Sequence, residues 1–323
     1  MTNSTLLLET DELKKYYPIK GGLFKKTIGN VKAVQNVSLK IYEGETLGVV
    51  GESGCGKSTL GRTILGLEKS TGGSISFRGE VLNDLSERKL KKFKKDMQMV
   101  FQDPFASLNP RQRIGHALEE VFVIHTDLDK NERKQRVLQL LREVGLKEEH
   151  YGRYPHEFSG GQRQRIGIAR AIALNPSLIV CDEAVSALDV SVQAQVIKLL
   201  KDLQEKYKLT YMFISHDLGV VKHMCDRVLV MYLGTMVELG SSKQIYHNPQ
   251  HPYMKALLSA IPRPVPGRKK MRVRLQGDIP SASNYPAGCP FHTRCPMAQA
   301  HCRTKVPEWR EVEEGHFVAC HEI

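Results

Sequence analysis

The sequence predicts an α/β protein with a mainly parallel sheet covered by helices, followed by a small cysteine-rich segment. A glycine-rich loop joins a strand pattern to a helical one, helices and strands alternate from Gln162 to Ser215, and four cysteines cluster beyond residue 288. The 323 residues suffice to bury a large core. With 41% hydrophobic and 25% charged residues, disordered, collagen-like and disulfide-dense chains are excluded.

Strand patterns dominate the N-terminal part of the chain. Apolar and polar residues alternate at 31–34 and 37–41, and an apolar run at 45–50 enters the glycine loop. The next expected elements are a helix at Thr59–Leu67, a strand and turn at Gly73–Val81, and a short buried strand at Gln98–Phe101.

The texture becomes helical from about Arg111 to Glu149. Apolar residues form a stripe from Val137 to Val144, and Asp129 followed by Glu132 resembles a capping box. The alternation that follows is helix Gln162–Leu174, strand Leu178–Cys181, helix Ser191–Tyr207 and strand Thr210–Ser215, then a hairpin over 226–240 and a proline-rich linker at 262–267.

Charge and hydropathy narrow the function classes. No apolar run approaches the length of a membrane span, and residues 1–15 lack the basic start of a secretory signal, so we expect a cytoplasmic protein. The net charge is +12, with basic runs at 88–95 and 263–274. Each run suits an anionic partner (a nucleotide, nucleic acid or lipid surface) or is simply a solvated face.

Residues Gly51 to Thr59 fit the phosphate-binding pattern G-x-x-x-x-G-K-[ST] between a strand and a helix. Glycines let backbone N–H groups curl around phosphates, and the helix N-terminus adds a favourable dipole. Lys57 is expected to contact the β- and γ-phosphates of ATP, and Ser58 to ligate Mg²⁺.

A second acidic signal follows the apolar strand at 178–181. Asp182 is expected to hold Mg²⁺, and Glu183 to orient and deprotonate the attacking water. The alternative is that the acid pair only caps the next helix.

The run Ser159-Gly160-Gly161-Gln162 predicts a second anion-binding helix N-terminus. It resembles the signature of ATP-binding cassette (ABC) ATPases, with Phe158 where that family usually has leucine. Gln102 resembles the family's Q-loop glutamine, the run 186–189 its D-loop, and His216 its switch histidine. The order and spacing agree over roughly residues 5–260.

This resemblance implies an ABC ATPase domain at 1–260, with an antiparallel β subdomain and a helical insert at about 105–160, and an extension at 261–323. It implies paired cassettes that face head to tail. Tyr17 aligns with the aromatic that stacks on adenine, although Tyr16 is its neighbour. The residues implied for ATP binding are Tyr17, Gly51, Ser53, Gly54, Cys55, Gly56, Lys57, Ser58 and Thr59. Those implied for catalysis are Glu183, His216 and Gln102; for Mg²⁺, Ser58, Gln102 and Asp182; and for the partner's ATP, Ser159, Gly160, Gly161 and Gln162.

Residues 43–58 and 101–111 and the start of an extension at His251-Pro252-Tyr253 resemble the ATP-binding subunits of bacterial oligopeptide and dipeptide importers. Related importers carry nickel, glutathione or other solutes. The resemblance implies a paralogous ATPase subunit as heterodimer partner, a pair of membrane permeases, and indirectly an extracellular or periplasmic peptide-binding protein. It places the chain peripherally on the cytoplasmic face of the membrane, with no nucleic acid expected. The alternative is a soluble ABC ATPase that acts on nucleic acid or ribosomes.

The cysteines of the C-terminal part are Cys289, Cys295, Cys302 and Cys320. Their thiolates suit an iron–sulfur cluster or zinc, and free or redox-active thiols are the remaining alternative. The importer extension is associated with a [4Fe–4S] cluster, which the resemblance therefore implies here. A structural role is expected rather than electron transfer, because the segment is too small to build a core from its apolar residues alone. His292, His301, His316 and His321 lie nearby in sequence as substitute ligands or as surface histidines.

Overall fold

The computed structural model describes residues 5–21, 26–83, 85–103, 108–261, 275 and 277–323. The expected linker at 262–267 and the basic run at 263–274 lie outside the described residues. The chain divides into two compact units. The first unit comprises Met1–Thr5, Tyr42–Glu45 and Asp84–Ile214, and the second comprises Leu6–Ile41, Thr46–Asn83 and Ser215–Ile323.

The first unit contains a parallel run of three strands in the order β6-β7-β8. The strands are β6 (Met97–Val100), β7 (Leu178–Asp182) and β8 (Thr210–Ile214). Every residue of β7 and β8 is buried, as expected for parallel strands covered on both faces. The apolar runs in the sequence therefore predicted these strands to within a residue of their ends.

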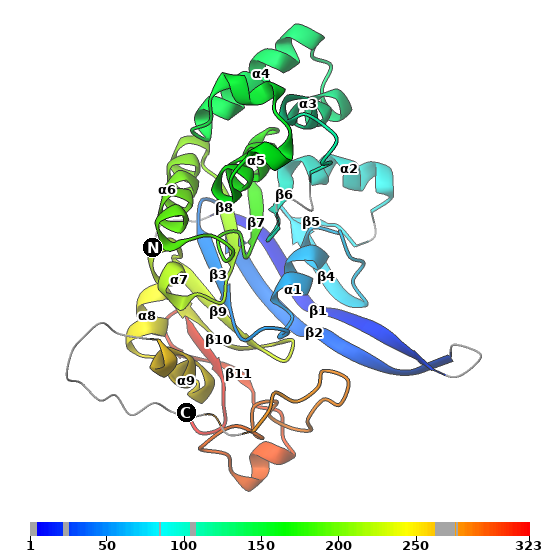
Figure 1. The fold of residues 1–323 in the computed structure, drawn as a ribbon. Coiled ribbons are helices and arrows are strands. Elements are labelled where there is room, and N and C mark those ends of the chain that lie inside the picture. The colour runs from blue at the N-terminus through cyan, green and yellow to red at the C-terminus, as the bar shows by residue number, and fades with distance from the viewer. Residues whose placement is uncertain (1–4, 22–25, 84, 104–107, 262–274, 276) are drawn as a thin grey trace, which may run out of the picture. The chain divides into compact units, whose positions relative to one another are not determined.

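The other regular elements of the first unit are helical (Figure 1). They are α2 (Glu87–Asp96), α3 (Ile114–His125), α4 (Lys130–Glu143), α5 (Gly160–Ile172) and α6 (Val190–Tyr207), with 3-10 turns at Glu148–Gly152 and Pro155–Glu157. The helices α3 and α4 and the first 3-10 turn contact one another. This is the helical texture that the sequence predicts from Arg111 to Glu149.

The predicted capping box at the start of α4 is confirmed. The Asp129 carboxylate accepts the N–H groups of Asn131 at 2.7 Å and Glu132 at 2.9 Å. In return, Glu132 accepts the N–H of Asp129 at 2.8 Å. Three N–H groups at the end of the helix are thereby satisfied by side chains.

The second unit carries an antiparallel sheet in the order β2-β1-β4-β5. Its strands are β1 (Leu6–Gly21), β2 (Lys26–Tyr42), β4 (Gly72–Phe77) and β5 (Glu80–Val81). Leu7, Leu8 and Phe77 are fully buried, so the apolar positions of these strands form a core.

A second run of strands in this unit has the order β11-β12-β10-β9-β3. The strands are β3 (Thr46–Val50), β9 (Arg227–Tyr232), β10 (Thr235–Ser241), β11 (Trp309–Glu313) and β12 (His316–Ala319). β3 lies parallel to β9, and β9 and β10 form the hairpin that the sequence predicts. The remaining elements of the unit are α1 (Lys57–Ile64), α7 (Leu218–Met224), α8 (Ser242–His247), α9 (Pro252–Ala260) and a 3-10 turn at Ala300–Arg303.

Some boundaries differ from the sequence prediction, for local reasons. The helix α1 begins at Lys57 rather than Thr59, directly after the glycine loop, and the left-handed Gly66 (φ 64°) follows its end. The helix α5 begins at Gly160 rather than Gln162, because Ser159 caps it. The helix α2 was not predicted, since the basic run offers only Leu90 and Phe93 as an apolar face. Within the described residues, no helix is long and apolar enough to cross a membrane.

Candidate nucleotide site and cysteine cluster

The glycine loop lies between β3 and α1 in the second unit. Gly51, Gly54 and Gly56 have φ values of 154°, 78° and 100°. A Cβ on Gly51 would lie 2.3 Å from the Met231 oxygen, and one on Gly56 would lie 2.0 Å from the Ala33 oxygen. The loop is therefore restricted to glycine at these positions by backbone that packs against it.

Lys57 is the first residue of α1 and is only 4% exposed. Its ammonium group donates to the carbonyl oxygens of Gly51 at 2.8 Å and Glu52 at 3.0 Å. No acidic residue lies in the first turn of α1. The helix dipole and the lysine therefore both favour an anion at this loop.

Further predicted nucleotide-binding residues belong to the loop itself and to the first turn of α1. Ser53 and Gly54 are exposed, Ser58 and Thr59 are half-buried, and Cys55 is buried. Burial raises the pKa of the Cys55 thiol, so the thiol stays protonated despite the nearby Lys57.

The two neighbouring tyrosines differ in their surroundings. The Tyr17 hydroxyl donates to Glu68 and also interacts with Thr59, in the first turn of α1. Tyr17 is 36% exposed, and the Lys15 ammonium lies 4.8 Å from the centre of its ring. The Tyr16 N–H donates to Thr71 instead, at 3.1 Å. The Tyr17 side chain thus interacts with the first turn of α1, and its stacking on adenine stays a prediction.

His216 lies exposed just before α7. On either side of it, Ser215 donates its N–H to the Val49 oxygen at 3.2 Å, and Asp217 caps α7 through the N–H groups of Gly219 and Val220. The backbone around the predicted switch histidine is therefore held from both sides.

In the first unit, Asp182 and Glu183 lie at the carboxyl end of β7. Asp182 is 2% exposed, and Glu183 is half-buried with a left-handed backbone (φ 48°). The N–H of Glu183 donates to the Ile214 oxygen at 3.0 Å. The Gln102 amide donates to a Glu183 carboxylate oxygen at 2.9 Å, so the structure brings these two predicted catalytic residues together.

The predicted signature run forms the start of α5. Ser159 and Gln162 make a reciprocal capping box, with bonds of 3.3 Å and 3.0 Å. A Cβ on Gly161 would lie 2.4 Å from Val192 of α6, which explains glycine there. Ser159 and Gly160 are exposed, whereas Phe158 is 4% exposed and packs edge-on against the His150 ring. The Phe158 side chain is therefore part of the buried apolar core.

The predicted D-loop, residues 186–189, continues from Glu183 into α6. Ser186 donates both its N–H, at 3.1 Å, and its hydroxyl, at 2.9 Å, to the Glu183 oxygen. The chain therefore turns tightly between the acid pair and the D-loop.

The structure also brings the four C-terminal cysteines together. All are free, Cys289, Cys302 and Cys320 are buried, and Cys295 is half-buried. Burial is the main cause that raises the pKa of Cys289 to about 11, and the nearby sulfurs of Cys320, Cys302 and Cys295 contribute to the same increase. The N–H groups of Phe291, Met297 and Glu322 bond the sulfurs of Cys289, Cys295 and Cys320 and oppose these increases. Such N–H donors stabilise thiolates.

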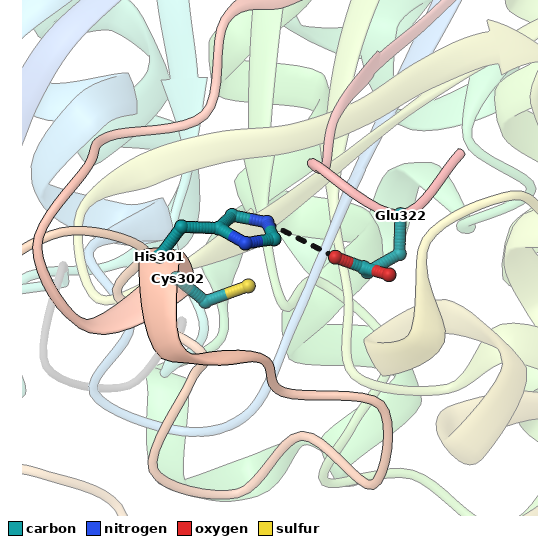
Figure 2. Close-up of side chains that lie close together, drawn as sticks. All are labelled: His301, Cys302 and Glu322. Carbon is teal, nitrogen blue, oxygen red and sulfur yellow. Dashed lines mark ion pairs between the residues drawn. The ribbon is translucent and has the colours of Figure 1, made fainter.

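The spacing of the sulfurs bears on what they can hold. Thiolates on one zinc ion, at about 2.3 Å from the metal, lie within about 4 Å of one another. Among the described residues, the potential ligands with donor atoms within 4.8 Å of one another are His301, Cys302 and Glu322. Figure 2 shows this group, in which His301 and Glu322 form an ion pair of 3.1 Å. Only one of the four cysteines belongs to it, so the cysteine arrangement is wider than a zinc site requires.

Three of the nearby histidines have other partners. His292 bonds the Cys289 oxygen at 2.8 Å, His321 bonds the Lys305 oxygen at 2.9 Å, and the fully buried His316 pairs with Glu238 at 2.8 Å. His301 is the histidine placed beside a cysteine sulfur. These contacts favour the four sulfurs over histidines as ligands.

Comparison with known proteins identifies the family of the chain. The ABC transporter family model matches residues 34–186, and the model for the C-terminal region of oligopeptide/dipeptide transporters matches residues 237–302. The oligopeptide transport ATP-binding protein AppF of Bacillus subtilis is 56% identical over 322 residues, which cover 99% of this chain and 98% of AppF. The dipeptide transport ATP-binding protein DppF of Haemophilus influenzae is 52% identical over the full length of both chains.

The chain belongs to the oligopeptide and dipeptide transport ATP-binding proteins. A solved dimeric cassette, MJ0796 in a post-hydrolysis state with ADP and phosphate, has a TM-score of 0.65 and 30% identity over 73% of this chain and 99% of its own. This ABC transporter subunit is therefore an ATPase with the cassette fold. The predicted family and the predicted ATPase activity are both confirmed.

The sequence analysis did not predict two side-chain contacts of this ATPase. Glu52, the second residue of the glycine loop, binds Arg294 through a pair of hydrogen bonds. Glu322 lies beside Cys302. Neither contact has a signal in the sequence, because Glu52 and Arg294 are 242 residues apart and Glu322 forms no local pattern with Cys302.

Proposed function

We propose that this ABC ATPase powers the import of short peptides. The observation that carries the proposal is the match of residues 237–302 to the C-terminal region of oligopeptide/dipeptide transporters. The full-length similarity to AppF and DppF supports it, because both relatives are named for oligopeptide or dipeptide transport. We also propose that the cassette spans 1–260 and the extension 261–323.

The assigned side chains have distinct roles in hydrolysis. Lys57 binds the β- and γ-phosphates, and the glycine loop supplies N–H donors. Ser58, Gln102 and Asp182 would hold Mg²⁺, and the ion would supply positive charge to neutralise the charge that develops on the phosphates. Glu183 takes the proton of the attacking water, which the hydrogen bond from Gln102 supports by orienting its carboxylate. His216 contributes to holding the γ-phosphate, and Tyr17 stacks on the adenine.

The same proposal includes the assembly. Ser159, Gly160, Gly161 and Gln162 close over the ATP of a second cassette, which we take to be a paralogous subunit. A pair of permeases forms the membrane path, and an external binding protein delivers peptide to them. The chain then lies peripherally on the cytoplasmic face of the membrane.

We further propose that Cys289, Cys295, Cys302 and Cys320 hold a [4Fe–4S] cluster with a structural role. Support comes from the donor set of four sulfurs, the three backbone N–H groups that bond sulfur, and a spacing wider than one zinc ion requires. A cluster would replace core that so short a segment cannot build from apolar residues.

Uptake of a labelled short peptide tests the main proposal. Source cells would carry wild-type protein, Glu183→Gln, or the matched control Glu205→Gln, which changes an exposed glutamate of α6. We expect Glu183→Gln to retain ATP binding, to slow phosphate release by about 10²-fold or more, and to abolish uptake, because a general base is lost.

The control variant should behave as wild type. Phosphate release near the wild-type rate in Glu183→Gln would remove Glu183 from the role of base. Slow phosphate release with unchanged peptide uptake would point to another solute, with nickel or glutathione as the next to test.

A further inference from the structure

Both main-chain polar groups of Glu52, its N–H and its carbonyl oxygen, form hydrogen bonds. Its N–H donates to the Tyr253 hydroxyl at 2.8 Å, and its carbonyl oxygen accepts the Lys57 ammonium at 3.0 Å and the Cys55 N–H at 3.3 Å. The position of Glu52 therefore influences both the phosphate-binding lysine and the curvature of the loop.

The Glu52 side chain reaches the cysteine segment of the same unit. Arg294 donates from Nη1 to Oε2 at 2.6 Å and from Nη2 to Oε1 at 3.0 Å, a bidentate pair. The Arg294 side chain is 8% exposed and that of Glu52 25%. The hydrogen bonds to Glu52 hold the pKa of the guanidinium above its ordinary value. The pair is therefore a shielded ionic contact rather than a loose surface one.

The position of Arg294 is set by the cysteine segment. Arg294 directly precedes Cys295, and its N–H bonds the Phe291 oxygen at 3.0 Å. In the same turn, the His292 N–H donates to the Cys289 carbonyl oxygen at 3.1 Å. The Cys289 N–H donates to the Cys302 carbonyl oxygen at 2.8 Å. A change in the shape of this segment would consequently move the guanidinium.

A cluster of three aromatic rings packs beside the contact between Arg294 and Glu52. The rings of Tyr232, Tyr253 and Phe291 have centroids 4.9 to 5.3 Å apart, and each ring is at most 1% exposed. The Arg294 guanidinium lies 5.9 Å from the centre of the Tyr232 ring. Tyr253 contributes the hydroxyl that binds the Glu52 N–H. The cluster thus connects the cysteine segment to the loop by a second, apolar route.

We propose that Arg294 is a positioning residue of the nucleotide site, through which the cysteine segment 289–302 sets the affinity of the glycine loop for nucleotide. By holding Glu52, Arg294 holds the loop in the shape that presents its N–H groups and Lys57 to phosphate. The proposal rests on nucleotide binding by this loop and does not depend on what the cysteines hold. By linkage, bound nucleotide must stabilise the cysteine segment by the same factor.

The first test measures the dissociation constant of Mg·ADP on the full chain. The variants are Arg294→Gln, Glu52→Gln, the double variant, and the control Arg303→Gln, an exposed arginine adjacent to Cys302. We expect each single variant to weaken binding by about tenfold, a typical allosteric coupling. The double variant should be no weaker than the singles, because both remove one contact, and Arg303→Gln should match wild type.

A melting temperature for each variant separates positioning from stability. A lower melting temperature with unchanged ADP affinity in Arg294→Gln would make the pair merely structural and overturn the proposal. Additive losses in the double variant would also overturn it. If Arg294→Gln does not fold, Glu52→Gln and the shortened Glu52→Asp provide the same comparison from the loop side. Failure of wild-type protein to bind ADP would remove the premise instead.

The second test uses hydrogen exchange in the segment 289–303. ADP should slow exchange there in wild-type protein and in Arg303→Gln, and should have no such effect in Arg294→Gln. Unchanged exchange in wild-type protein with saturating ADP would contradict the link between the two sites.

Discussion

Glu183 has a left-handed backbone (φ 48°), which few residues other than glycine adopt. Such a conformation costs about 1–3 kcal/mol and persists only where the surroundings enforce it. Here the Glu183 N–H bonds the Ile214 oxygen, its carbonyl accepts Ser186, and its carboxylate accepts Gln102. Glu183 is thus held through its N–H, its carbonyl oxygen and its carboxylate, which is the fixed placement that the predicted role of a general base requires.

At the same scale, His251 couples stability to pH. It is buried at the N-cap of α9, where its Nδ1 accepts the Tyr253 N–H at 3.1 Å, and burial lowers its pKa to about 3. As pH falls below 6.5, the unfolded chain takes up a proton that the folded chain excludes. This contribution to stability is therefore lost progressively between pH 6.5 and pH 3.

We expect His251 to account for about 2 kcal/mol of the loss of stability between pH 7 and pH 5. The variant His251→Asn keeps a capping acceptor but no titratable group. Urea unfolding at both pH values should show a smaller loss for this variant than for wild type. Equal losses in the two proteins would show that His251 does not titrate as its burial requires.

At the scale of elements, α4 is the helix whose start the sequence defines best. Asp129→Ala removes the acceptor for the N–H groups of Asn131 and Glu132, and should destabilise the protein by about 1 kcal/mol. Asp127→Ala, at an exposed position just before the helix, is the matched control. Denaturant unfolding compares the two, and a loss as large for Asp127→Ala would attribute the effect to charge rather than to capping.

The elements that the sequence predicted share a strong local signal. The strands β7 and β8 are mostly apolar and wholly buried, and α4 and α5 begin with side chains that cap them. The elements that it missed lack such a signal. The helix α2 is almost wholly basic, and β11 is mostly exposed, so its strand conformation depends on pairing with β12. Long-range pairing decides these segments, and local pattern cannot show it.

At the scale of the whole molecule, the residues of the site also divide into those that a local sequence pattern predicts and those that depend on long-range contacts. The glycine loop, the acid pair and the capped signature run were predictable because each chemistry needs particular residues at a fixed local spacing. The Arg294 contact with Glu52 was not, because its partners are 242 residues apart and neither belongs to a local pattern with the other. Likewise, the sequence suggested His316 as a substitute ligand or a surface histidine, whereas the structure buries it against Glu238.

Bound nucleotide should stabilise the whole protein, and this stabilisation should require Lys57. A ligand that binds only the folded state stabilises it by about 2.7 kcal/mol at 100 times its dissociation constant. We expect ATP with Mg²⁺ to raise the melting temperature of wild-type protein and of the control Lys69→Ala, an exposed lysine after α1. Lys57→Ala should largely lose this shift, because the lysine that the loop carbonyls hold in place is then missing. Since the removal of Lys57 also changes the loop itself, the quantity to compare is the shift on adding nucleotide, not the melting temperature alone. A full shift in Lys57→Ala would mean that the phosphates bind elsewhere and that the glycine loop is not the principal nucleotide contact.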